Sequence, residues 1–472
     1  MKYRTPLIAS LALSVALLTG CSSTASPLSA SDSATVVTTQ SESGSGSDSA
    51  DSGSTEESST AASAFTGDLS PQEVLNANAD YTTVNEDEWS ESDAIDVSLS
   101  GSTAKVASGT EGVTVSGSTV TIDAAGVYRL SGSLDGQVVV AAPNDAQVVL
   151  LLDGASIDNG EGPAIEVQTA DDVAIHLADG SENSVSDASS YAEDATANAA
   201  IDARADLTIS GSGSLTVQGN GNDGISSTDD LVILGGDITV TAADDALRGK
   251  DALVIEGGTL ALTATGGDGL KSDQEDDDTR GYILVSGGTI DITAGDDGLQ
   301  AQTDTVVTGG SITAAVADDG VKGEVTVSIA GGEITVTEST EAVEAANIAI
   351  FDGVIDLNAS DDGINASGLN DGSQDREADS GERLEISGGT ITVKATADGL
   401  DSNGTVTVSG GDITITSAQN GGDGPVDANG EITVTGGTIM ANGSEWDAAS
   451  AQQGPGGMPG GGTGGGPGRM PN

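Results

Sequence analysis

The chain has 472 residues, with 14 lysines and arginines against 75 aspartates and glutamates, so its formal net charge is -61. Such a charge excludes nucleic acid as a partner, because phosphate binding needs basic side chains. It also predicts bound cations, since so many carboxylates repel one another unless cations lie among them.

The first residues have the layout of a secretory signal segment. Lys2 and Arg4 precede an apolar run that is too short to span a bilayer comfortably, and small residues precede Cys21. Cys21 is the only cysteine in the chain, so it has no disulfide partner. We therefore predict a lipoprotein signal peptide over 1–20, lipid attachment at Cys21, and anchoring on the extracellular face of a bacterial membrane.

Low-complexity segments flank a long repetitive region. Residues 21–64 are rich in Ser, Thr, Gly and Asp and predict a disordered tether. Residues 446–472 are mostly Gly, Pro and Met, without a hydrophobic period, and predict a flexible tail. Residues 65–94 are expected to form an N-terminal cap on the repeats.

Residues 95–445 repeat one phrase, seen from Leu231 as LVILGGDITVTAADDALRGK. Each copy holds alternating β-branched stretches, a Gly-Gly pair and an Asp-Gly turn. Gly-Gly pairs at 287, 309 and 331 set a period of 22 residues. A period of that length, built only from short strands, predicts an all-β solenoid, a parallel β-helix in which each strand pairs with its copy in the next coil.

Aligning the copies on the Asp-Gly turn gives an unbroken acidic column: Asp223, Asp245, Asp268, Asp297, Asp319, Glu341, Asp362, Asp398 and Asp423. Turn chemistry accounts for the residue type, because Asp bonds its own backbone and Gly adopts the left-handed conformation. It does not account for the charge, since successive coils would place carboxylates about 5 Å apart. Two copies depart: Glu341-Ala342 replaces Asp-Gly, and Pro425 interrupts the aliphatic ladder.

Calcium suits such a column, because it takes six to eight oxygen ligands in loose geometry. A second acidic residue precedes the column in several copies, and the insertion over 273–278 adds further carboxylates. The predicted calcium ligands are Asp244, Asp245, Asp268, Asp296, Asp297, Asp318, Asp319, Asp361, Asp362, Asp398 and Asp423.

Three of the few basic residues, Arg248, Lys271 and Lys322, recur one place beyond the aliphatic residue of the turn. One interpretation makes them salt-bridge partners of the acidic column. The alternative makes one of them the base of a calcium-dependent polysaccharide lyase, which abstracts the proton beside a uronate carboxylate.

Other catalytic classes have less support. His176 is the only histidine, which argues against zinc, and a single histidine within a strand is more often structural. A two-carboxylate glycosidase stays open, since a row of acids supplies pairs at many separations.

The run NDGISSTDDLVILGGDITVTAADDALRGKD, followed by GGDGLKSD and GYILVSGGTI, resembles the bacterial carbohydrate-binding domain-containing lipoproteins once known as a domain of unknown function. The resemblance covers roughly residues 80–445 and extends to the cysteine, the Ser-rich spacer and the Gly-Pro-Met tail. It implies a right-handed, pectate-lyase-like β-helix, calcium on that helix, and binding of plant cell-wall polysaccharide.

Three functional hypotheses follow. The leading one is a non-catalytic surface protein that binds acidic, pectin-like polysaccharide through calcium. The alternatives are a calcium-dependent lyase and a structural or adhesive surface rod that calcium stiffens. The scarcity of aromatic residues, 2% of the chain, argues against stacking on flat glucans. Nothing in the sequence indicates an oligomeric state.

Overall fold

The computed structural model describes residues 67–192, 195–369, 378–419 and 423–447. The chain divides into two compact units, Met1–Ser58 and Ser59–Asn472, and the whole first unit lies outside the described residues. The predicted signal peptide, Cys21, the tether and the tail from residue 448 onward therefore lie outside them as well. Within the described ranges, no helix is long and apolar enough to cross a membrane.

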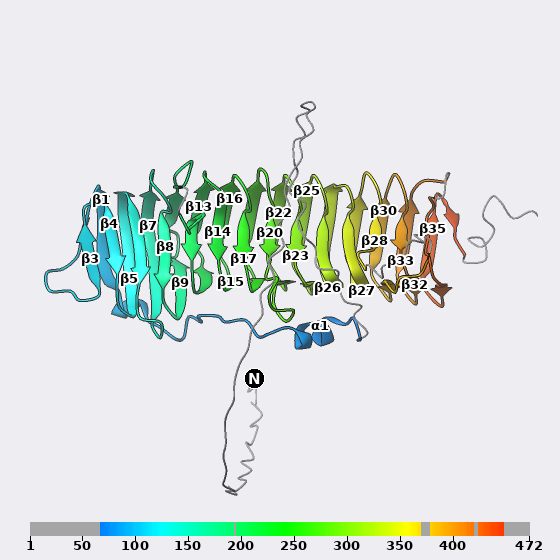
Figure 1. The fold of residues 1–472 in the computed structure, drawn as a ribbon, viewed down its shortest axis with the longest axis horizontal. Coiled ribbons are helices and arrows are strands. Elements are labelled where there is room, and N and C mark those ends of the chain that lie inside the picture. Colours follow the sequence, from blue (N-terminus) through cyan, green and yellow to red (C-terminus); the bar gives the residue numbers. More distant parts are fainter. Residues whose placement is uncertain (1–66, 193–194, 370–377, 420–422, 448–472) are drawn as a thin grey trace, which may run out of the picture. The chain divides into compact units, whose positions relative to one another are not determined.

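Almost all strands belong to three parallel ladders, each running through successive repeats (Figure 1). The site ladder contains β4 (Thr119–Ile122), β6 (Gln137–Ala141), β8 (Ile165–Thr169), β11 (Ala199–Ala203), β14 (Asp223–Ser227), β17 (Leu247–Gly249), β20 (Leu270–Ser272), β23 (Leu299–Ala301), β28 (Ile364–Ala366) and β31 (Leu400–Ser402). Its strands are short, and the Asp-Gly turns come directly before most of them or open them.

The second ladder, here the strap ladder, contains β1 (Ile95–Gly101), β5 (Gly126–Asp135), β7 (Gln147–Asp158), β9 (Asp172–Leu177), β12 (Asp206–Gly211), β15 (Asp230–Ile233), β18 (Ala252–Ile255), β21 (Tyr282–Val285), β24 (Asp304–Val307), β29 (Arg383–Ile386), β32 (Thr405–Val408) and β34 (Ile432–Val434). The third ladder contains β10 (Glu182–Ser186), β13 (Ser214–Gly219), β16 (Asp237–Ala242), β19 (Thr259–Ala264), β22 (Thr289–Ala294), β25 (Ser311–Val316), β30 (Thr390–Lys394), β33 (Asp412–Thr416) and β35 (Thr438–Ala441).

Two long strands, β26 (Val321–Glu338) and β27 (Val343–Asn358), take part in all three ladders. Antiparallel strands occur only at the two ends of the described sheet. These are β2 (Ala104–Lys105), β3 (Val113–Ser116) and β36 (Ser444–Glu445).

The strands pair with their copies one period later, as the repeat predicts. Leu247 of β17 pairs with Leu270 of β20, and Leu270 pairs with Leu299 of β23. The third ladder alternates exposed and buried residues, so its Ile, Leu and Val side chains enter one continuous apolar core. Matching aliphatic residues from neighbouring strands thus stack on one another.

The second glycine of each Gly-Gly pair allows neighbouring turns to approach closely. Gly310 has a φ of +84°, a conformation that L side chains rarely adopt, and an added Cβ would lie 2.8 Å from the carbonyl oxygen of Gly287 in the preceding repeat. Both the backbone conformation and the lack of space therefore require glycine here.

The fold-class prediction, an open right-handed β-helix solenoid, is wrong for this structure. The strands form a closed parallel β-barrel of 14 strands with further strands outside the ring. β7, β26 and β27 each pair with members of both the strap ladder and the third ladder. The prediction treated each glycine pair as a strand break, whereas β26 runs without interruption through Gly331 and Gly332.

The segment predicted as an N-terminal cap, described from residue 67 to residue 94 and here called the strap, runs along the strap ladder (Figure 1). It contains helix α1 (Pro71–Ala77) and the short 3-10 helix η1 (Glu91–Asp93). Pro71 opens α1, where its missing N–H costs no hydrogen bond. Leu69, Val74 and Val84 are buried against the sheet, so the strap covers part of its outer apolar surface.

Candidate functional site

The acidic column forms one hydrogen-bonded row along the edge of the site ladder, here called the acidic row. From Asp223 to Asp319, the Oδ1 of each aspartate accepts the backbone N–H of the next aspartate along the ladder. Glu341 interrupts this pattern, because its carboxylate accepts the side-chain amide of Asn365 instead. Asp245 accepts from Asp268 at 2.8 Å, Asp268 from Asp297 at 2.8 Å, and Asp297 from Asp319 at 2.7 Å. All four side chains are buried, and so is that of Asp223.

This geometry corrects the sequence explanation of the Asp-Gly turn. The aspartates bond the backbone of the neighbouring repeat, not their own. Gly269 and Gly298 have no positive φ, so they are not needed for a left-handed turn. They are needed for space: a Cβ at Gly269 would lie 2.4 Å from Cγ2 of Ile292. Asp-Gly therefore supplies an acceptor for the next strand and room for a tight inner contact.

The row continues to the C-terminal end with a shift of one residue. Asp362 accepts the N–H of Asp398 at 2.7 Å, and Asp398 accepts the N–H of Gly424, not of Asp423. Leu400 pairs with Val426. The alignment that placed Asp423 in the column, with Pro425 interrupting the aliphatic ladder, is therefore wrong by one position. Asp423 is exposed beside the row.

The middle residues of the site-ladder strands form a second row. Register puts Arg248 beside Lys271, and Lys271 beside Gln300. The row runs through Ser226, Arg248, Lys271, Gln300, Lys322, Glu344, Asn365 and Asp401, and the corrected alignment adds Asp427. Basic residues therefore lie along the middle of the ladder, and acidic residues lie at its C-terminal end.

The two lysines are salt-bridge partners of the acidic row. Lys271 Nζ lies 3.1 Å from Asp268 Oδ2 and 3.7 Å from Asp245 Oδ2. Lys322 Nζ lies 2.8 Å from Asp319 Oδ2 and 3.9 Å from Asp297 Oδ2. In Asp245, Asp268 and Asp297, one carboxylate oxygen thus bonds the backbone and the other faces an ammonium group.

Arg248 points to the insertion instead of the row. Its guanidinium donates to Asp273 Oδ2 from Nη2 at 2.7 Å and from Nε at 3.0 Å. The insertion over 273–278 therefore contributes a structural ion pair at this position, and Arg248 is held by it.

Burial dominates the titration of the row. The pKa of Asp223 and that of Asp297 are raised to about 8, mainly by burial and in part by neighbouring carboxylates, although Arg248 and Lys322 act in the opposite direction. Burial alone would lower the pKa of Lys271 and Lys322, but the adjacent carboxylates outweigh it and raise both pKa values. Both lysines therefore hold their protons firmly.

Three acidic clusters lie along the middle of the row, each with carboxylate oxygens within 4.8 Å of one another. They are Asp268 with Asp296 and Asp297, Asp297 with Asp318 and Asp319, and Asp319 with Glu341 and Glu344. Lys322 also lies 3.2 Å from Glu344 Oε2, so its charge offsets the third cluster. Of the other predicted ligands, Asp244 is half-buried and Asp361 is exposed, and neither belongs to such a cluster.

The fourth cluster, here called the end cluster, joins Asp398, Asp401 and Asp427, whose oxygens also lie within 4.8 Å of one another. No lysine or arginine in the described ranges forms an ion pair with these three residues. Burial and nearby carboxylates raise the pKa of Asp398 to about 7 and that of Asp401 to about 6. The end cluster therefore concentrates negative charge without a protein cation.

A neutral oxygen lies beside the end cluster. Asn365 pairs in register with Asp401, and its side chain is only 8% exposed. Its Nδ2 donates to Glu341 Oε2 at 2.9 Å, whereas its buried Oδ1 has no hydrogen-bond partner. Sequence reasoning missed Asp401, Asp427 and Glu344 as cluster members. Alignment by strand register, not by the Asp-Gly pair, would have found Asp427.

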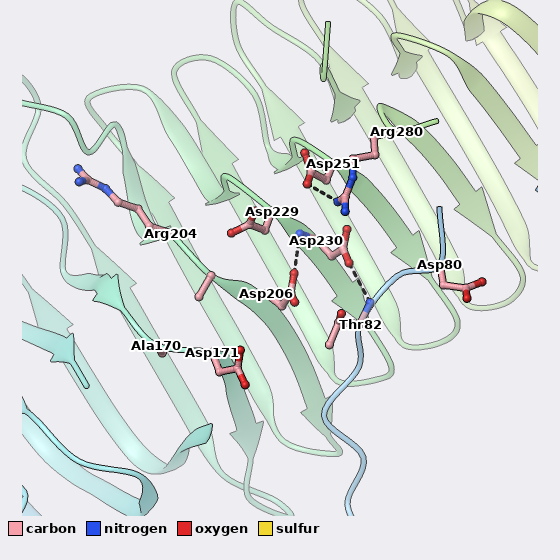
Figure 2. Close-up of a pocket in the computed structure, with 11 residues that line it drawn as sticks. Asp80, Thr82, Ala170, Asp171, Arg204, Asp206, Asp229, Asp230, Asp251 and Arg280 are labelled. Carbon is pink, nitrogen blue, oxygen red and sulfur yellow. Dashed lines mark hydrogen bonds and ion pairs between the residues drawn. The ribbon is translucent and has the colours of Figure 1, made fainter. Parts of the chain in front are cut away.

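A pocket of about 290 Å³ lies elsewhere, between the strap and the turns before the strap ladder (Figure 2). Asp206, Asp229 and Asp251 line it together with Arg204 and Arg280. Protein groups already bond much of this lining: Asp230 accepts the N–H of Thr82 at 2.8 Å, and Arg280 pairs with Asp251. The bond between Asp230 and Thr82 therefore helps to hold the strap on the sheet at this pocket. The sequence analysis did not identify the pocket.

His176 is structural, as its place in a strand suggested. Its ring lies edge-on to Trp89 of the strap, with ring centroids 4.9 Å apart, and Nδ1 bonds the hydroxyl of Ser210 at 2.9 Å.

The parallel strands thus carry a long polar row along one ladder. The chain belongs to the carbohydrate-binding domain-containing protein family, whose model matches residues 116–363 and 322–421. No curated protein matches the chain. Among solved structures, the polysaccharide lyase-like protein from C. thermocellum, in a gadolinium derivative, is 33% identical. That match covers 52% of this chain and 94% of the other, with a TM-score of 0.45.

Proposed function

We propose that the protein binds acidic polysaccharide along the site ladder, without cleaving it, and that calcium held by the acidic row bridges protein and sugar. Family membership supports carbohydrate as the ligand class. The observation that carries the finer proposal is the end cluster, where three carboxylates gather without a protein cation.

The end cluster suits calcium by the chemistry of its donors. Asp398, Asp401 and Asp427 offer only oxygens, and Asn365 Oδ1 adds an uncharged oxygen one strand away. Calcium accepts carboxylate and amide oxygens in loose geometry, and in this position it would offer positive charge to a uronate carboxylate. Asp268, Asp296 and Asp297 form a second candidate set, with Lys271 already offsetting part of their charge.

The site ladder suits an extended polymer because its outward residues repeat at the strand spacing of about 4.8 Å. Lys271 and Lys322 provide positive charge in the middle of the ladder, and calcium would provide it at the end. Both sources of charge favour a polyanion, whereas a protein of this net charge would otherwise repel one.

The lyase alternative needs a side chain that gives up its proton and takes another from the sugar. The carboxylates around Lys271 and Lys322 raise the pKa of both, which makes them poor general bases. Arg248 is paired with Asp273. These contacts favour binding over cleavage.

We also propose that Cys21 carries the lipid that holds the protein on the extracellular face of a bacterial membrane. The support is the sequence Leu18-Thr19-Gly20-Cys21 after an apolar run. Substituting Cys21→Ala should move the protein from the membrane fraction to the soluble fraction and abolish labelling by a fatty acid. Unchanged membrane retention and labelling would contradict lipid attachment at this residue.

The main test is calorimetric titration of polygalacturonate into the protein, with calcium and with chelator. We compare the wild type with Asp427→Asn, which alters the end cluster, and with Asp423→Asn, a matched acidic change beside it. We expect binding only with calcium, weakened at least tenfold by Asp427→Asn, about 1.4 kcal/mol, and unchanged by Asp423→Asn.

Three results would contradict the proposal. Equal binding in chelator would remove calcium from the mechanism. Absence of binding to any uronan, with a melting temperature that still rises with calcium, would favour the structural rod. Growth of ultraviolet absorbance during incubation would instead show the unsaturated products of a lyase.

A further inference from the structure

Helix α1 of the strap lies over a row of polar side chains on the strap ladder that is separate from the acidic row. Register pairs Asp304 of β24 with Thr326 of β26, and Thr326 with Asn347 of β27. The strap reaches this row through Asn78, whose Nδ2 donates to Asp304 Oδ2 at 2.8 Å. Nearby, Ser328 Oγ donates to the carbonyl oxygen of Leu69 at 2.7 Å.

Four oxygens at this position are buried; the two amide oxygens lack a hydrogen-bond partner, and the Thr326 hydroxyl faces only the Asp304 carboxylate. The four are Asp304 Oδ1, Thr326 Oγ1, Asn347 Oδ1 and Asn78 Oδ1. Asp304 is 8% exposed, and Thr326 and Asn347 are fully buried. Unpartnered buried oxygens are rare in folded proteins, so a concentration of them on neighbouring strands indicates a bound species.

The protein's own hydrogen bonds fix which amide atom is which. Asn347 Nδ2 donates to the carbonyl oxygen of Val325 at 3.0 Å, and Asn78 Nδ2 donates to the carbonyl oxygen of Val74 at 3.0 Å. If either amide group were rotated by 180°, its oxygen would face a backbone carbonyl oxygen, and neither atom could donate a hydrogen bond. The unpartnered atoms of both asparagines are therefore carbonyl-type oxygens that need a positive partner.

Asp304 adds a charge that the protein does not offset. No lysine or arginine in the described part of the chain forms an ion pair with it, although its side chain is buried. A water molecule could satisfy hydrogen bonds here, but it would not balance the charge of a buried carboxylate, as a bound cation does.

We propose that Asp304, Thr326, Asn347 and Asn78 form a binding site for a hard cation of the calcium class, which fastens the strap to the sheet. The donors are one carboxylate, one hydroxyl and two amide oxygens, all of which calcium accepts. Asp304 and Asn347 lie on either side of Thr326, one strand spacing of about 4.8 Å away in each direction, so an ion beside the Thr326 hydroxyl would lie between their side chains. This site lies on the strap ladder and does not depend on the sugar-binding role of the site ladder.

Terbium luminescence separates this site from the acidic row. Terbium(III) takes oxygen ligands as calcium does and emits when a nearby tyrosine is excited. Tyr282 lies beside Asp304, because the next residue, Ile283, pairs with Thr305. In the full chain, we expect sensitised emission that calcium displaces and that Tyr282→Phe reduces.

The variants decide between an ion and a water molecule. Asp304→Asn should weaken terbium binding at this site at least tenfold, and Asn347→Asp should strengthen it roughly tenfold by adding a second carboxylate. Asp398→Asn, at the end cluster, should leave the Tyr282-dependent emission unchanged. Calcium should also slow proteolysis of the strap in the wild type and not in Asp304→Asn.

Emission that survives Asp304→Asn, or disappears with Asp398→Asn, would assign the signal to other carboxylates and overturn the proposal. Absence of Tyr282-dependent emission in the wild type, together with calcium-independent proteolysis of the strap, would leave water as the occupant. Since the readout involves no sugar, its failure is distinct from failure of polysaccharide binding.

Discussion

The acidic row offsets its charge differently in its middle and at its C-terminal end. In the middle, Lys271 and Lys322 lie within salt-bridge distance of the buried aspartates. At the end, Asp398, Asp401 and Asp427 gather without a basic side chain. The same backbone arrangement therefore occurs with a protein cation in the middle of the row and, within the described residues, without one at its end.

The largest expected effect comes from removing the internal cation. Lys322→Met leaves Asp297, Asp319 and Glu344 without their shared partner and should lower the free energy of unfolding by about 3 kcal/mol in chelator. Calcium should restore much of the lost free energy of unfolding, because it would take the place of the ammonium group. Denaturant unfolding with and without calcium measures both effects.

Lys394→Met is the control for that change. Lys394 is exposed and lies 3.9 Å from Asp356, so its loss should alter stability by less than about 0.5 kcal/mol. If Lys322→Met lowered the free energy of unfolding no more than Lys394→Met does, the buried lysine would not offset the negative charge of the acidic row.

The next effect concerns pH. The folded pKa of Asp223 and of Asp297 is about 8, above the usual value of about 3.9 in an unfolded chain. Between these values the folded protein binds more protons than the unfolded one, so its stability falls as pH rises. In chelator, acidification from about pH 8 to about pH 5 should therefore raise the free energy of unfolding. A free energy of unfolding that rises with pH over this range would contradict this prediction.

A smaller effect tests the end of the row directly. Asp398→Asn removes one charge from the end cluster and should weaken calcium binding there about tenfold, or 1.4 kcal/mol. Asp297→Asn should have less effect on calcium binding, because Lys322 already offsets Asp297. Calcium titration by calorimetry compares the two. If Asp297→Asn lost more calcium affinity than Asp398→Asn, calcium would bind more tightly in the middle of the row than at its end, contrary to this prediction.

The smallest expected effect belongs to Asp423→Asn. Asp423 is exposed and its backbone N–H does not join the row, so calcium affinity should change less than about twofold and stability less than about 0.5 kcal/mol. A larger change would mean that the alignment on the Asp-Gly pair describes the last repeat better than strand register does.

Much of the site follows from the sequence because the repeat fixes strand pairing. The period of 22 places Asp297 beside Asp319, and it places Lys322 among the acids. The period does not predict whether a strand continues through its glycine pair. β26 continues through Gly331 and Gly332, and the strands form a closed ring that the sequence did not predict.

The remaining errors have local causes. Residue type alone aligned Asp423 with the row, whereas the backbone uses Gly424. The polar contacts of the strap join residues far apart in sequence, such as Asn78 and Asp304, and no repeat signals them. The resemblance suggested carbohydrate binding correctly at the level of the family, and the polymer itself stays a prediction.

The carboxylate-to-amide bonds of the acidic row act as register marks along the site ladder, from Asp223 to Asp319 and again from Asp362 to Gly424. Successive marks are 22 or 23 residues apart in most repeats, but 29 between Asp268 and Asp297 and 36 between Asp362 and Asp398. The bond is kept at each distance, so each aspartate returns the chain to the same alignment after an insertion of any of these lengths. Loops between the marks can therefore be lengthened or replaced by foreign segments while the outward row of the site ladder keeps its spacing.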